Sequence, residues 1–270
     1  MRWTVVARRD WRQTVGATST KVLLGLVGFT VLLAGYVYPV LAPDPITTAR
    51  FSGFVIGSLT TLVPLVGILL GYNAVVGERE SGSLLLSLAL PLGREDVVLG
   101  KYASRTGLLA ATIVVAMAGA GALVVYPFGE LALLPFLGFV LLSVLFGAIW
   151  TGMGVAVSLA VSTKRRALVL GSTLFFLFVV VMDVVEGALT LGLYTAGLVE
   201  EPVLPDPIRF LVGLEPGRLF GRLTTGFVDP SSTIEGPWYL GEWVALVLFA
   251  LWLVGPLGLA YLRFEGRDLA

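Results

Sequence analysis

The chain has 270 residues, of which 57% are hydrophobic and only 13% are charged. A soluble domain carries about 25% charged residues, so much of this surface is expected to face lipid. The absence of cysteine and histidine excludes thiol catalysis, disulfide bonds and histidine acid–base chemistry, and removes the usual ligands of zinc and copper. With no net charge and no basic tail, nucleic acid is not an expected partner, and no metal or cofactor is expected to bind directly.

Residues 1–20 are expected to form an amphipathic helix in the membrane interface. Trp3 and Val6 would face the acyl boundary, with Arg8 and Arg12 at the headgroups. A disordered cytoplasmic tail is the alternative. The mixture of charge, Trp and Thr before the first apolar run, with no small-residue cleavage site, argues against a cleaved signal peptide.

Six stretches are long enough to cross a bilayer, which takes roughly 20 apolar residues. Five of them lack any charged residue over 20 to 33 positions. The fifth stretch in chain order has only 16 uncharged residues, 167–182, and becomes a full span by continuing through Asp183 and Glu186 to Leu193. The sequence therefore predicts an all-α polytopic membrane protein with one transmembrane domain over 1–270. The expected spans cover about 22–42, 53–76, 104–127, 132–160, 167–193 and 242–262.

Basic residues are distributed unevenly between the two sides of these spans. The two termini and the connections after the second and fourth spans contain 14 of the 18 Lys and Arg residues, and the other connections contain 4. By the positive-inside rule the first side is cytoplasmic. Both termini are therefore expected in the cytoplasm, as an even number of spans requires, and the expected location is the cell (plasma) membrane.

The connection over 199–241 is the one long external loop that the sequence predicts. It contains six prolines, and Pro216 is a candidate start for a short helix. This connection is too short for an independent domain and is expected to cap the outer face of the bundle. In the second span, the pairs Gly53/Gly57 and Gly67/Gly71 have the four-residue spacing that permits close helix approach in lipid.

The cytoplasmic segment 77–101 has more features than a simple connection needs. Charged residues Glu78, Arg79 and Glu80 close the second span, Gly82 breaks the helix, and a short apolar helix is expected up to Pro91. Such a helix at the membrane surface needs cover, which a protein partner would provide. The alternative for the charged triplet is a solvated helix end with an internal ion pair, worth at most about 1 kcal/mol.

This segment resembles the coupling loop of the type-2, exporter-type ABC transporter permeases. In that family a charged end of the second span leads through Gly-Ser/Thr-Leu to Pro, then Arg, then Gly-Lys before the third span. The topology resembles the same family over the whole chain, and it is most similar to the single-domain permeases that include the nitrous-oxide-reductase maturation permease. The matching positions are Glu78, Arg79, Glu80, Gly82, Ser83, Leu84, Pro91, Arg94, Gly100 and Lys101.

The resemblance implies a mechanism and its partners. The short helix would dock in a groove of a separate ABC ATPase, two ATPase copies would close on ATP, and two permease copies, as a homodimer, would form an export pathway for an unidentified substrate. ATP and magnesium would be used by the ATPase. This chain is not expected to be an enzyme, because Gly100-Lys101 fails as a phosphate-binding loop: Glu95 replaces the first glycine and Tyr102 replaces the Ser or Thr.

Asp183 and Glu186 lie three residues apart and so share a helical face. Charged residues within a span are candidates for function, here a substrate or cation contact, although both acids are wet if the helix ends near Met182. An ion-coupled secondary transporter using these two acids is therefore the alternative function. An intramembrane protease is disfavoured because both acids lie on one helix, and a membrane anchor would not need the segment 77–101.

Overall fold

The computed structural model describes residues 3–82, 93–126, 129–229 and 236–265. Within these ranges the chain is helical apart from turns, loops and one isolated bridge between Thr47 and Glu130. Six helical segments in the described part of the chain are long and apolar enough to cross a membrane, which confirms the predicted all-α class with six spans. They are Thr18–Leu41, Thr48–Glu80, Arg94–Val125, Leu133–Ala160, Lys164–Thr195 and Glu242–Phe264.

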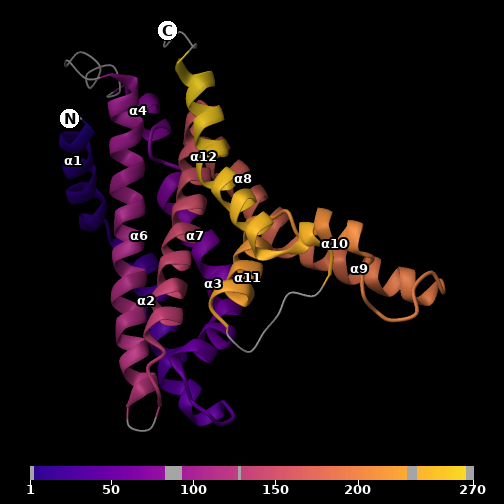
Figure 1. Cartoon of the computed structure of the whole chain (residues 1–270). Helices are drawn as coiled ribbons and strands as arrows, with labels where there is room; N and C mark the ends of the chain where they lie inside the picture. Colours follow the sequence, from indigo (N-terminus) through magenta and orange to yellow (C-terminus); the bar gives the residue numbers. More distant parts are fainter. Residues whose placement is uncertain (1–2, 83–92, 127–128, 230–235, 266–270) are drawn as a thin grey trace.

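Four long helices form the packed part of the bundle: α2 (Thr18–Leu41), α3 (Thr48–Gly71), α6 (Arg94–Val125) and α7 (Leu133–Ala160) (Figure 1). Glycines bring α3 and α7 together, since a Cβ on Gly71 would lie 2.7 Å from the Cα of Gly154. A Cβ on Gly67 would lie 2.7 Å from the Cβ of Trp150, whereas Gly53 has no neighbour within 4 Å. Of the two glycine pairs in the sequence, Gly67/Gly71 forms this contact.

The second span ends in two steps. After α3 the chain turns and forms α4 (Val76–Glu80), and the hydroxyl of Ser158 on α7 accepts hydrogen bonds of 2.9 Å from the amides of Val75 and Val76. These bonds satisfy backbone donors that the break in the helix leaves without partners.

The third span begins at Arg94, ten residues before the expected start at 104. Asp96 accepts a 3.2 Å hydrogen bond from the amide of Gly93 at the start of this helix. Charged residues that mark the end of an apolar stretch in the sequence therefore belong to the helix itself.

The fifth span has little support from the rest of the chain. It consists of α8 (Lys164–Phe175), a π-helical turn η1 (Phe176–Val181) and α9 (Met182–Thr195), and 6% of its most apolar window is buried. Figure 1 shows α9 leading away from the packed bundle. The last span, in α12 (Glu242–Glu265), is only 11% buried. Both helices therefore leave apolar surface for lipid or for another protein chain.

The external connection contains α10 (Asp206–Val212), α11 (Pro216–Phe227) and the short 3-10 helix η2 (Trp238–Leu240). Helix α11 begins at Pro216, where the sequence predicts a short helix. Phe220 of α11 stacks on Phe139 and Phe146 of α7, with ring centroids 5.9 and 4.7 Å apart. The external connection is thus packed into the bundle.

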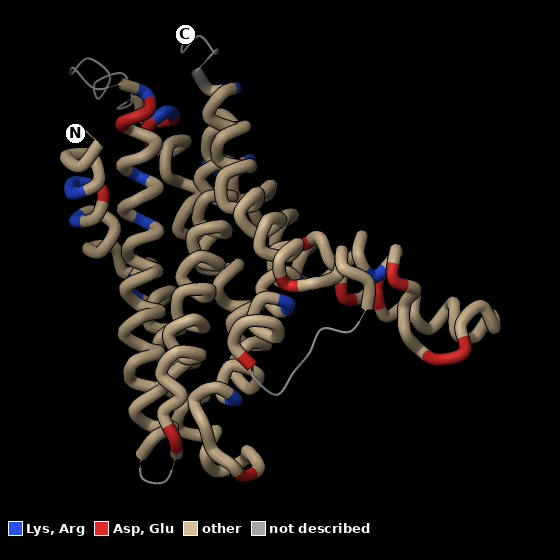
Figure 2. Tube along the Cα trace, in the orientation of Figure 1, with Lys and Arg blue, Asp and Glu red and all other residues tan. Residues whose placement is uncertain are grey.

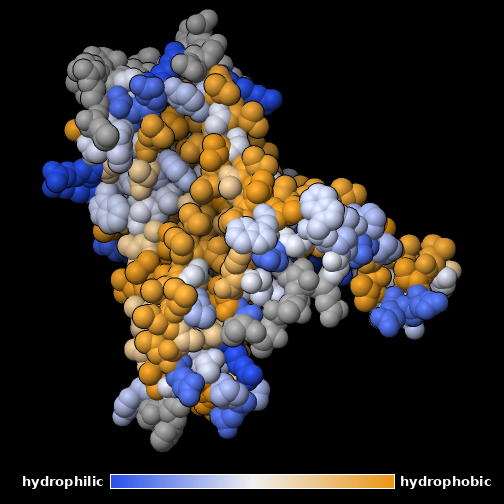
Figure 3. All heavy atoms as spheres, in the orientation of Figure 1, coloured by the Kyte–Doolittle hydropathy of each residue, from blue (hydrophilic) through white to orange (hydrophobic). Residues whose placement is uncertain are grey.

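Charge and hydropathy divide the molecule into zones. The start of the N-terminal helix and the end of α12 lie at the same end of the bundle, as Figure 1 shows, and Figure 2 shows Lys and Arg concentrated toward that end. Further charged residues gather around α9, α10 and α11 (Figure 2). Between these zones the surface is largely hydrophobic (Figure 3), as expected of a protein surrounded by lipid.

Candidate functional site

The charged segment predicted at 77–101 lies at the same end of the bundle as the termini. Glu78, Arg79 and Glu80 form the last residues of α4, and Gly82 has a φ of +73°, a conformation that favours glycine and ends the helix. Glu80, Ser81 and Gly82 are exposed. The predicted short helix and Pro91 lie outside the described residues.

Lys101 joins the two ends of this segment through an ion pair with Glu78. Its ammonium lies 2.8 Å from the carboxylate of Glu78 and donates a 2.6 Å hydrogen bond to the carbonyl of Ala74. Only 4% of Lys101 is exposed, and the carboxylate of Asp10 lies 3.9 Å away. A buried ammonium with these partners holds the end of the second span against the third.

Asp10 connects the N-terminal helix α1 (Trp3–Gly16) to the same cluster. Its two carboxylate oxygens each accept a 3.3 Å hydrogen bond from the guanidinium of Arg105. Arg105 also donates to the carbonyl of Leu70 on α3. The sequence alone does not reveal the pairing of Asp10 with Arg105, although an acid on an otherwise basic amphipathic helix indicates that the helix has a partner inside the protein.

Gly100 allows α1 to approach α6. A Cβ at this position would lie 2.7 Å from the Cβ of Val6 and 2.8 Å from the carbonyl oxygen of Trp3. The family resemblance assigns Gly100 and Lys101 to a coupling segment. In the structure these two residues contact α1 and α4 of the same chain.

Arg79 and Arg94 reach the end of the last span. Their guanidinium carbons lie 5.3 and 5.6 Å from the ring centroid of Phe264, and Arg94 donates a 3.1 Å hydrogen bond to the carbonyl of that residue. Arg79 also donates a 3.1 Å hydrogen bond to the carbonyl of Val161, which follows α7. The segment predicted to couple to a partner is thus connected to four of the six spans and to α1.

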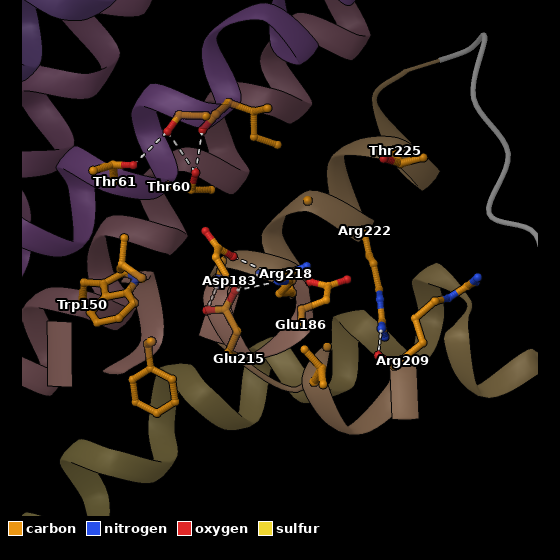
Figure 4. A pocket seen from close by; sticks show the side chains of 18 of the residues that line it. Thr60, Thr61, Trp150, Asp183, Glu186, Arg209, Glu215, Arg218, Arg222 and Thr225 are labelled. Carbon is orange, nitrogen blue, oxygen red and sulfur yellow. Dashed lines mark hydrogen bonds and ion pairs between the residues drawn. The ribbon is translucent and has the colours of Figure 1, made fainter. Parts of the chain in front are cut away.

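The second candidate site surrounds Asp183 and Glu186 on α9. Both carboxylates pair with Arg218 of α11, at 2.6 Å for Asp183 (Figure 4). Glu215 lies 3.7 Å from the same guanidinium and caps α11 by accepting hydrogen bonds from the amides of Gly217 and Arg218 at 2.9 and 2.7 Å. Burial raises the pKa of the Glu215 carboxyl, against the opposing effect of these hydrogen bonds and of Arg218.

The sequence did not predict the pairing of Arg218 with Asp183, because the two residues lie 35 positions apart. The spacing of Glu215, Arg218 and Arg222, at intervals of three and four in a short amphipathic helix, was the signal for a charged face. A cavity of about 690 Å³ opens at this face, between α3, α7, η1, α9, α10 and α11. We call it the α9–α11 cavity, and Figure 4 shows its labelled charged and aromatic side chains.

No group of three or more metal-ligating side chains gathers in the part of the chain that the structure describes. The expectation that the protein binds no metal stays a prediction.

The fold and these sites define a class of protein, a multi-pass helical membrane protein in which one charged segment contacts most of the spans. The model of the ABC-2 family transporter proteins matches residues 5–269. This chain therefore belongs to the ABC-2 transporter family, which confirms the family that the sequence resembles, and it is a transmembrane permease subunit of the kind that works with an ABC ATPase.

Two relatives support this assignment. The chain is similar to the "Probable ABC transporter permease protein NosY" of Stutzerimonas stutzeri, with 33% identity over 219 residues that cover 77% of each protein. It is also similar to the protein of the same name in Pseudomonas aeruginosa, with 29% identity over 274 residues that cover 97% of this chain and 94% of the relative.

Proposed function

We propose that this chain is the membrane-spanning half of an ATP-driven exporter, in which two copies pair with two copies of a separate ATPase. The ATPase binds ATP and magnesium, and the chain itself holds no cofactor. The observation that carries the proposal is the position of the segment 77–101. Its exposed residues adjoin the ion pair of Glu78 with Lys101, and Arg79 and Arg94 contact Phe264 of the last span. A force applied to the exposed residues would therefore act on several spans.

The proposed docking surface consists of the exposed residues Glu80, Ser81 and Gly82 together with the neighbouring residues 83–92. The residues that connect this surface to the membrane helices are Glu78, Arg79, Arg94, Gly100 and Lys101. Because two ATPases close on ATP, the docked segments would move, and the permease would shift between two states with different access to its substrate.

The proposed orientation places both termini, the segment 77–101 and the ATPase in the cytoplasm, with the spans in the cell membrane. Its support is the excess of Lys and Arg in the connections at that side, together with the common position of the two chain ends in Figure 1.

Co-purification with the cognate ATPase tests the proposal. We expect the ATPase to co-purify with the wild type and with the charge reversal Glu201→Lys, an exposed residue of the external connection. The double variant Glu80→Lys with Ser81→Lys, which alters only exposed side chains, should insert normally and lose the ATPase. If the double variant retains the ATPase, or the wild type never binds one, the docking role is wrong.

A second copy of the permease would cover the fifth span. Its apolar residues Phe176, Val180 and Val184 are exposed in the single chain. Native mass spectrometry of the protein in a mild detergent should give a dimer, and the variant Val184→Arg should give a monomer. A wild-type protein that is monomeric under these conditions would contradict the homodimer.

The alternative of an ion-coupled carrier has weaker support. It requires Asp183 and Glu186 to take a cation, and both carboxylates already have Arg218 as a partner.

A further inference from the structure

Two residues that line the α9–α11 cavity have buried hydrogen-bond donors without partners in the described structure. Nη1 of Arg222 and Nε1 of Trp150 are both buried, both residues line the cavity, and neither atom has a hydrogen-bond acceptor in the structure. A buried donor without an acceptor is costly and uncommon in folded proteins. Each donor would gain a partner if its side chain turned toward a cavity ligand that brings acceptor oxygens.

The charge around Arg222 specifies the kind of acceptor. Burial lowers the pKa of the Arg222 guanidinium, the positive charges of Arg209 and Arg218 lower it further, and the carboxylate of Glu186 opposes these effects. Its Nη2 donates a 3.0 Å hydrogen bond to the carbonyl of Arg209, so this neutral contact does not balance the charge. Arg209 and Arg218 have acidic partners of their own, so an anionic oxygen at Nη1 would chiefly satisfy the donor of Arg222.

The acids of the cavity do not place an acceptor on Nη1 of Arg222. Asp183, Glu186 and Glu215 all pair with Arg218, Glu215 also accepts two backbone amides, and Glu186 acts on Arg222 through its charge alone. For the same reason the three carboxylates are poorly disposed to take a free cation. The cavity thus separates an ion-paired group around Arg218 from the unsatisfied donor of Arg222, as Figure 4 shows.

Gly213 makes room for the Arg222 side chain. A Cβ at Gly213 would overlap Nη2 of Arg222 and lie 2.6 Å from its Cζ. The position of the guanidinium in the cavity therefore depends on a glycine in the turn between α10 and α11.

The opposite wall of the cavity is largely apolar and aromatic. Ile56 of α3, Trp150 of α7 and Phe178 and Val179 of η1 line it, with the hydroxyl side chains of Thr60 and Thr61 beside them. A volume of about 690 Å³ lies in the range of sites for small organic molecules. A ligand with an apolar body would bury it against this wall.

We propose that the α9–α11 cavity binds an amphipathic organic anion, whose acidic group pairs with Arg222 and whose apolar body packs against Trp150 and Phe178. The proposal rests on the proposed transport function and narrows its substrate class. The anion is either a soluble metabolite or the headgroup of an anionic lipid, since both present the same chemistry to Arg222.

Binding to the purified permease in phosphatidylcholine nanodiscs tests the inference without any ATPase. The probes are 1-naphthalenesulfonate, the uncharged 1-naphthalenemethanol and the cationic 1-naphthylmethylammonium. We expect the sulfonate to bind best and the ammonium worst. The variant Arg222→Gln should weaken sulfonate binding about tenfold, the loss expected for one charge-assisted hydrogen bond. Arg222→Lys should fall between Arg222→Gln and the wild type, because Lys keeps the charge and loses the planar fork.

Two further variants guard against misfolding as the explanation. Gly213→Ala keeps every charge and should weaken sulfonate binding by displacing the guanidinium. Arg50→Gln removes an exposed arginine outside the cavity and should bind like the wild type. Equal binding of the three probes, or unchanged sulfonate binding in both Arg222→Gln and Gly213→Ala, would overturn the proposal. So would inorganic phosphate that binds as tightly as the sulfonate, because the apolar wall would then contribute nothing.

Adding phosphatidylglycerol to the nanodiscs identifies the source of the anion. Displacement of the sulfonate assigns the site to a lipid headgroup, and its retention assigns the site to a soluble anion, both of which support the anion site. The binding measurement needs no ATPase. Absence of sulfonate binding would therefore leave the docking proposal intact, and a failure of the ATPase to co-purify would leave the anion site intact.

Discussion

The carboxylate of Glu78 lies 2.8 Å from the ammonium of Lys101, so an ion pair joins the two ends of the segment 77–101. Lys101 is buried, and Asp10 and Arg105 extend the pair to the N-terminal helix. The exposed residues Glu80, Ser81 and Gly82 are therefore fixed to the membrane helices by charges that water cannot easily screen. This arrangement suits a segment that transmits motion.

Asp10 should be required for stability. The variant Asp10→Asn leaves the buried cations of Lys101 and Arg105 with one carboxylate fewer, which should reduce the free energy of unfolding by on the order of 3 kcal/mol. Unfolding in mixed SDS micelles measures the change. Arg9→Gln on the exposed face of α1 is the matched control and should lie within about 0.5 kcal/mol of the wild type. Equal curves for Asp10→Asn and the wild type would show that the cluster contributes nothing.

Gly100 should hold α1 in place. In Gly100→Leu the new side chain would collide with Val6 and the backbone of Trp3, so α1 should leave the surface of α6. Hydrogen exchange of residues 3–16 should become much faster than in the wild type. The same substitution at Gly25, which has no neighbour within 4 Å, should leave the exchange of these residues unchanged. Protection of α1 in both variants would refute the packing role of Gly100.

The contact between α3 and α7 should tolerate no added methyl group. Gly71→Ala places a Cβ 2.6 Å from the carbonyl oxygen of Thr151 and should cost about 1–3 kcal/mol of unfolding free energy. Gly53→Ala, in the same helix but in open space, should be neutral or stabilise the helix by up to about 1 kcal/mol. SDS unfolding of the two variants separates these outcomes, and equal effects would argue against close packing at Gly71.

Glu215 should give the stability a pH dependence of a particular sign. Because burial raises the pKa of Glu215 in the fold, the folded state holds a proton that the unfolded state has lost once the pH exceeds the ordinary value of 4.5. Its contribution to stability is present below that value and is lost as the pH rises through the raised pKa. Asp183, Glu186 and Arg218 also face this carboxyl, so the test is the difference between the wild type and Glu215→Gln. A difference that grows more favourable to the wild type as pH rises would contradict the sign.

The sequence predicted the spans because lipid contact imposes a long apolar run on each of them, whatever its neighbours are. It did not predict the start of α6 at Arg94. The charges of Arg94, Asp96, Lys101 and Arg105 end an apolar run in the sequence but have partners within the fold. The π-helical turn at Phe176–Val181 has no comparable signal among uninterrupted apolar residues.

Pairings between distant residues were also beyond the sequence. Asp183 and Glu186 stood out as acids near the end of a span, yet their partner Arg218 belongs to a helix after the next turn-rich stretch. The unsatisfied donors of Arg222 and Trp150 depend on packing around the cavity, which no spacing in the sequence encodes.

Site-specific cross-linking tests the docking account most directly, because the natural chain has no cysteine and one introduced thiol is unique. The variants Glu80→Cys and Glu130→Cys place it on exposed residues at opposite ends of the bundle. With a short bifunctional maleimide in membranes that contain the cognate ATPase, the account predicts a permease–ATPase product from Glu80→Cys and none from Glu130→Cys. A product from Glu130→Cys, or no product from Glu80→Cys despite an intact complex, would contradict docking at this segment.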